Sequence, residues 1–89
     1  MNATPPHEAM NRYLKDKSTD VTDSTLSNYQ TTLNVFCDWL TDKGGVENLN
    51  ELTSDEIQRF KEWRLENVQT ITLKTDMTCI KGFVRFCEH

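Results

Sequence analysis

Three basic residues and one hydroxyl recur near the end of the chain at helical spacing. They are Lys74, Thr78, Lys81 and Arg85, which are separated by steps of four, three and four residues. On a helix such spacing aligns them in one stripe. Lys and Arg neutralise phosphates, and an Arg in a major groove can pair with both acceptors on a guanine edge. The stripe is a candidate nucleic-acid surface, and its alternative is an ordinary solvated helix side.

Other reactive residue types form no catalytic set. A hydrolase or metalloenzyme needs a nucleophile or ligands with a base and an orienting group, and no such combination is found. Tyr13 and Tyr29 lie on apolar helix faces, so we interpret them as packing residues. The three cysteines fall in apolar helical stretches without Cys-x-x-Cys spacing, which indicates small buried hydrophobes. These are Cys37, Cys79 and Cys87. We expect no metal and no cofactor.

The charge balance opposes simple nucleic-acid binding. The 89 residues carry a net charge of -4, whereas Lys and Arg supply most non-specific affinity for phosphates. The charges are unevenly distributed, however: residues 19–67 hold ten acids against four bases, and the two flanks together hold six bases against four acids. A local basic stripe on an acidic exterior can still bind DNA. With no apolar run of about 20 residues and no secretory signal, we expect a cytoplasmic protein away from membranes.

Hydrophobic spacing predicts an all-α chain of four helices, over about residues 6–17, 24–43, 54–67 and 71–88. The second is the most regular, because its apolar residues recur at alternating steps of three and four. These residues are Leu26, Tyr29, Leu33, Phe36 and Leu40. The predicted buried stripe of the fourth helix is Leu73, Met77, Ile80, Val84 and Cys87. The chain is therefore expected to be a single small bundle.

Capping residues mark the helix boundaries. We expect Asp23 or Ser24 to accept the free amides of the second helix, and the glycine pair at 44 and 45 to end it. Before the third helix, Thr53 and Glu56 have the spacing of a capping box. In this motif each of the two side chains accepts a hydrogen bond from a free backbone amide at the start of the helix.

Taken in chain order, these features form a pattern that extends from about Met10 to Cys87. The first helix is followed by Ser24-Thr25 with Tyr29, Leu33, Phe36 and Trp39, then by Leu52-Thr53 leading into Asp55-Glu56-Ile57 and Phe60, and finally by Ile80, Phe83 and Phe86-Cys87. In order and spacing the pattern resembles the core-binding domain of tyrosine recombinases, the phage-integrase family.

The resemblance implies a four-helix, SAM-like bundle that forms one jaw of a clamp around a recombination half-site in double-stranded DNA. In such proteins a separate C-terminal domain cuts and rejoins the strand through a tyrosine nucleophile. That catalytic domain has no counterpart in residues 1–89, so we expect this chain to be non-catalytic and its parent to continue past His89. Family members act as multimers on DNA, which leaves contact between protomers open.

The resemblance also points to the second helix, because the second and fourth helices of the family lie across the major groove. Thr25 and Asn28 lie off the apolar face of this helix and close to its N-terminal amides. The N-terminus of a helix is a suitable place for a phosphate. Their alternative is ordinary surface. Lys43, at the far end of that helix, can reach backbone phosphate or can simply complement the helix dipole.

A second interpretation is a small helical protein–protein interaction module without DNA binding. It is favoured by the negative net charge and by three aromatic residues that the spacing leaves exposed, namely Trp63, Phe83 and Phe86. Salt-dependent binding to duplex DNA separates the two interpretations, because phosphate contacts release counterions and surface aromatics do not.

Overall fold

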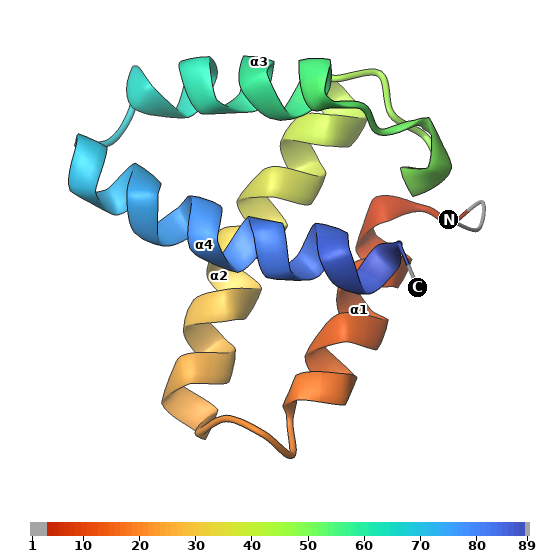
Figure 1. The fold of residues 1–89 in the computed structure, drawn as a ribbon, viewed down its shortest axis with the longest axis vertical. Helices are drawn as coiled ribbons and strands as arrows, with labels where there is room; N and C mark the ends of the chain where they lie inside the picture. Colours follow the sequence, from red (N-terminus) through yellow and green to blue (C-terminus); the bar gives the residue numbers. More distant parts are fainter. Residues whose placement is uncertain (1–3, 89) are drawn as a thin grey trace.

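The computed structural model describes residues 4–88, which form four α-helices and one short 3-10 helix (Figure 1). In chain order they are α1 (Pro6–Lys17), α2 (Asp23–Asp42), η1 (Leu49–Glu51), α3 (Ser54–Leu65) and α4 (Thr70–Cys87). The predicted all-α, four-helix fold is confirmed. The element η1 was not predicted and lies in the connection between the second and third helices.

The helices are arranged as two hairpins that cross. In Figure 1, α1 and α2 run side by side, while α4 crosses the middle of α2 and α3 crosses near the C-terminal end of α2. The resulting body is flat, with extents of 32 × 32 × 18 Å. Because the body is thin, every helix keeps a solvent-exposed side, and the contacts where the hairpins cross form the core.

A chain of aromatic rings links all four helices through this core. Ring centroids are 5.6 Å apart between Tyr13 of α1 and Phe83 of α4, and 6.4 Å apart between Phe83 and Phe36 of α2. Phe36 in turn lies 5.0 Å from Phe60 of α3. All three pairs are edge-to-face, an arrangement that the ring quadrupoles favour. The chain of rings therefore fixes how the two hairpins cross.

The position of Phe83 corrects the predicted buried stripe of α4. The sequence pattern places Val84 and Cys87 in that stripe and leaves Phe83 exposed, but Phe83 is 0% exposed and the other two are half-buried. The reason is that α1 and α2 both pack against α4, so its buried surface is wider than one stripe. At Gly82 an added Cβ would lie 3.0 Å from the Tyr13 hydroxyl oxygen, so α1 and α4 approach closely there.

Two predicted helix boundaries are confirmed by their capping contacts. The capping box of Thr53 and Glu56 is present at the start of α3, where the Thr53 amide donates to Glu56 Oε1 at 2.8 Å. The Thr53 hydroxyl oxygen also accepts from the Asp55 amide at 3.3 Å. Past the end of α2, Gly45 has a φ of 69°, a left-handed conformation that glycine adopts without strain.

The predicted N-cap of α2 is wrong by one or two positions. The cap is Thr22, whose backbone is extended and whose hydroxyl oxygen accepts from the Thr25 amide at 3.2 Å. Asp23 is already the first helical residue, where its negative charge complements the positive end of the helix dipole. Ser24 follows inside the first turn and therefore cannot be the cap.

Candidate nucleic-acid interface

The exposed side of α4 is basic and free of exposed acids. Lys74, Lys81 and Arg85 are all exposed, as is Thr78 between them. The one acid within α4 is Asp76, which is 7% exposed and faces the interior. In a chain with a net charge of -4, the structure thus concentrates positive charge on one helix side.

Asp76 is held by side chains from two other helices. Arg64 Nε of α3 donates to Asp76 Oδ2 at 3.1 Å, and the Thr32 hydroxyl of α2 donates to Asp76 Oδ1 at 3.3 Å. The carboxylate is therefore satisfied inside the fold, and its charge is offset by the guanidinium. Asp76 was not predicted as a buried residue, although its helical spacing from Leu73 and Ile80 places it on the buried face.

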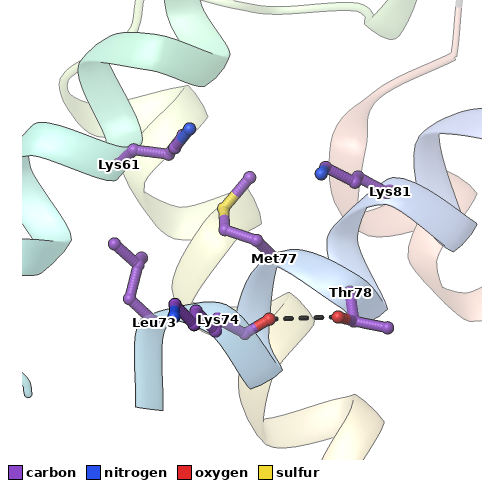
Figure 2. Close-up of a pocket in the computed structure, with 6 residues that line it drawn as sticks. All are labelled: Lys61, Leu73, Lys74, Met77, Thr78 and Lys81. Carbon is purple, nitrogen blue, oxygen red and sulfur yellow. Dashed lines mark hydrogen bonds between the residues drawn. The ribbon is translucent and has the colours of Figure 1, made fainter. Parts of the chain in front are cut away.

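A shallow hollow of about 310 Å³ lies between α3 and α4 (Figure 2). Its lining residues are Lys61, Leu73, Lys74, Met77, Thr78 and Lys81. In Figure 2 the Met77 side chain stands in the middle, and the amino groups of Lys61 and Lys81 point toward it from opposite sides. The lining therefore combines an apolar centre with three ammonium groups and no carboxylate.

A second hollow, of about 220 Å³, continues along α4 toward its C-terminal end. It shares Met77 and Lys81 with the first hollow and adds Arg85. Its other lining residues are Ile57, Ile80, Val84 and Glu88. The stripe predicted from the sequence thus runs along a groove between α3 and α4, rather than over a convex helix side.

The predicted hydroxyl groups are already engaged in local hydrogen bonds. Thr78 donates to the Lys74 carbonyl oxygen at 3.0 Å, which leaves its oxygen lone pairs as the groups that can meet a ligand. The Thr25 hydroxyl accepts from the Thr22 hydroxyl at 3.0 Å as part of the N-terminal turn of α2. Asn28 is exposed one turn further along α2.

Lys43 lies in different surroundings from the stripe. It is the C-cap of α2, about 27 Å from Thr25 along the helix axis, and its amino group lies 5.2 Å from the ring centroid of Trp63. The hollow beside it is also lined by Asp38 and Asp42, so the local charge is negative. The structure therefore groups Lys43 with aromatic and acidic side chains, and not with Lys74 and Lys81.

Lys61 is the basic residue that the sequence analysis missed. It lies on α3, whose surface mixes acids and bases and gives no stripe in the sequence. Its neighbour Glu62 is directed elsewhere, where Glu62 Oε1 accepts from Gln58 at 3.4 Å. Only the packing of α3 beside α4 reveals that Lys61 shares a hollow with Lys74 and Lys81.

The reactive side chains of the fold are suited to packing rather than chemistry. Burial raises the pKa of the Cys37 thiol to about 12 and those of Cys79 and Cys87 to about 11, so all three are protonated at neutral pH. Tyr13 is 4% exposed, and burial raises its pKa as well. Within residues 4–88, no three His, Cys, Asp or Glu side chains group closely enough to hold a metal ion.

The described helices also include none that is long and apolar enough to cross a bilayer. Within residues 4–88, the exposed large apolar side chains are Leu65, at 48%, and Ile71, at 70%, on either side of the turn between α3 and α4. Of the aromatic residues favouring a protein-interaction module, Phe83 is buried, and Trp63 and Phe86 are half-buried.

This fold is that of the SAM-like helical domains. Residues 10–89 match the family profile of the phage integrase N-terminal SAM-like domain, which covers most of the sequence. The chain belongs to this family. Domains of the family bind DNA and are non-catalytic.

A solved structure shows the same fold. The chain is similar to the crystal structure of the N-terminal domain of a phage integrase/site-specific recombinase from Haloarcula marismortui, with a TM-score of 0.90 at 24% identity. The alignment covers 97% of this chain and 83% of that one. A search of curated protein sequences gives no significant match.

Proposed function

We propose that the chain is the DNA-binding domain of a site-specific tyrosine recombinase. It clamps a recombination half-site in double-stranded DNA, while a separate C-terminal domain of the same protein cuts and rejoins the strand. The observation that carries the proposal is the charge of α4, whose exposed side presents three basic residues and no acid in a chain of net charge -4. Family membership supplies the second support.

In this proposal the side chains along α4 contact different parts of the DNA. Lys74 and Lys81 neutralise backbone phosphates and so position the domain on the duplex. Arg85, with its planar fork of donors, holds a phosphate or the acceptor edge of a guanine. Between them, the Thr78 oxygen accepts a hydrogen bond from a base amino group, since its own proton is donated to the Lys74 carbonyl oxygen. Thr25 and Asn28, in the first turns of α2, meet the sugar-phosphate backbone of the duplex.

Lys43 is expected to contribute less to DNA binding than these residues. Its ammonium group lies over Trp63, and the carboxylates of Asp38 and Asp42 line the adjoining hollow. A phosphate approaching there meets two negative charges, so the contribution of Lys43 to DNA affinity is smaller than that of Lys81.

The proposed partners follow from the same role. They are double-stranded DNA, the C-terminal catalytic domain of the parent protein, and further protomers assembled on DNA, with the cytoplasm as the compartment. One domain holds only part of the affinity, because two linked domains that grip the same duplex raise each other's effective concentration. No metal or cofactor takes part in the binding.

The alternative remains a helical protein-interaction module without DNA binding. The burial of Phe83 removes one of the aromatic residues on which that interpretation depends, while the exposed Leu65 and Ile71 still favour it. Fluorescence anisotropy of a labelled duplex, titrated with the 89-residue chain at about 50 mM and about 200 mM salt, separates the two. Binding that weakens as salt rises is expected, and an unchanged anisotropy at both concentrations would overturn the proposal.

A further inference from the structure

The hollow between α3 and α4 has a chemical character that the stripe on α4 does not explain by itself. It places Lys61 of α3 opposite Lys81 of α4, with Lys74 at the near edge (Figure 2). We infer that this hollow seats one backbone phosphate of duplex DNA between Lys61 and Lys81, so that α3 is a DNA-contacting element beside α4. The inference rests on the proposed function and adds a residue and a helix to it.

The lining of the hollow is positively charged. Three ammonium groups and no carboxylate line the hollow, in a chain where acids outnumber bases by 14 to 10. Amino groups that face one another repel, and an anion between them relieves that repulsion. By contrast, the hollow beside Lys43 contains two carboxylates, so an accumulation of lysines is not a general property of this surface.

The buried acid nearest in sequence to Met77 is already paired inside the fold. Asp76 directly precedes Met77, and an unpaired carboxylate there would cancel part of the positive field in the hollow. Its oxygens instead accept from Arg64 at 3.1 Å and Thr32 at 3.3 Å. The field above Met77 therefore comes from the lysines.

The centre of the hollow is apolar. Met77 and Leu73 are each 6% exposed and form an apolar surface. The lysine side chains of α3 and α4 extend over this surface. Lysine stems cover such a surface while their ammonium groups stay in water. Low-polarity walls also strengthen the attraction between an ammonium group and a phosphate, compared with the same pair in open solvent.

The inference is tested by the salt dependence of DNA binding in charge-matched variants. Lys61→Gln keeps most of the stem but removes the charge, and Lys15→Gln does the same at an exposed lysine in the last turn of α1. Loss of one phosphate contact lowers the slope of log K against log salt by about 0.9, which weakens binding about 15-fold at about 50 mM salt and about fourfold at about 200 mM. We expect this for Lys61→Gln, no change for Lys15→Gln, and recovery for Lys61→Arg.

Two further readouts identify the contact as backbone phosphate. Lys61→Gln weakens binding by the same factor on two unrelated duplex sequences, because a phosphate contact carries no sequence information. Inorganic phosphate, replacing chloride at constant ionic strength, does not displace the duplex beyond the effect of chloride. Specific displacement would show a free-anion site, and a sequence-dependent effect would show a base contact; either result overturns the inference.

The outcomes also separate this inference from the proposed function. Suppose that the unaltered chain binds duplex DNA, and that Lys61→Gln and Lys15→Gln give the same slope of log K against log salt. The proposed phosphate contact on α3 is then overturned, and the proposed DNA-binding surface on α4 is retained. If the unaltered chain does not bind duplex DNA at about 50 mM salt, both are overturned. Circular dichroism of each variant checks that the helices are intact.

Discussion

Arg64 of α3 and Asp76 of α4 form an ion pair that links these two helices, with 3.1 Å between Nε and Oδ2. Their side chains are 20% and 10% exposed, so the pair is largely removed from water. It has two consequences. It offsets the charge of the one acid within α4, and it fixes α3 beside α4 so that Lys61 and Lys81 border the same hollow.

Removing one partner of this pair should destabilise the fold. Asp76→Ala leaves a largely buried guanidinium without its carboxylate and the Thr32 hydroxyl without its acceptor, so we expect the free energy of unfolding to fall by about 2–4 kcal/mol. Urea denaturation followed by circular dichroism measures this. The control is Asp38→Ala, which removes a carboxylate that is 65% exposed and bonded to His7, and which should cost about 0.5 kcal/mol or less. Equal losses in the two variants would contradict the structural role of Asp76.

Phe83 should contribute to stability as a central core residue. Phe83→Ala opens a cavity where α1, α2 and α4 meet, and we expect a loss of about 3–5 kcal/mol in the free energy of unfolding. Phe86→Ala, on the half-buried ring that lies 5.2 Å from Tyr13, should cost clearly less. Chemical denaturation of both variants decides this. A loss below about 1 kcal/mol for Phe83→Ala would mean that the ring is available for an external partner.

Substitutions at the N-cap of α2 test where this helix begins. Thr22→Ala removes the hydroxyl that accepts from the Thr25 amide, and should lower the free energy of unfolding by about 1 kcal/mol. Ser24→Ala, two positions later and inside the helix, should be neutral or slightly stabilising because alanine has the higher helix propensity. The reverse order in thermal or urea denaturation would favour Ser24, one of the two caps predicted from the sequence, over Thr22.

The cysteines should make stability fall at high pH. Burial raises the pKa of Cys37 to about 12, and those of Cys79 and Cys87 to about 11, from an ordinary 9.0. The folded state thus favours the neutral thiol, so this contribution is complete below the pKa of the unfolded chain and is lost as the pH rises from about 9 through the folded values. We expect a lower urea midpoint at about pH 10 than at about pH 8.

Other groups titrate in the same pH range, so the thiol contribution needs its own control. A Cys79→Ala, Cys87→Ala variant should lose less stability than the unaltered chain between these two pH values. The same loss in both proteins would assign the effect to other groups.

The fold could be predicted from the sequence because its signals are local. The apolar period of α2, the capping box at Thr53 and the glycine pair after Lys43 each act within a few residues. The signals that failed depend on which helices come together. Phe83 is buried because α1 also packs on α4, a contact made possible by Gly82. No local period contains that information.

The candidate site divides in the same way. The stripe of Lys74, Lys81 and Arg85 follows from helical spacing alone, and all three are exposed in the structure. Lys61 joins the hollow through the packing of α3 on α4, and its own helix has no basic stripe to reveal it. The acidic surroundings of Lys43 depend likewise on tertiary structure. That these residues bind DNA stays a prediction.

The most direct test of the account is the salt dependence of duplex binding in two charge-matched triple variants. One is Lys74→Ala, Lys81→Ala, Arg85→Ala on α4, and the control is Arg12→Ala, Lys15→Ala, Arg59→Ala, which removes the same charge from exposed positions of α1 and α3. The account predicts that the α4 variant loses about 2–3 units of the slope of log K against log salt, because each phosphate contact supplies about 0.9, while the control loses less than one. Equal losses in the two variants, or duplex binding that does not change with salt, would contradict it.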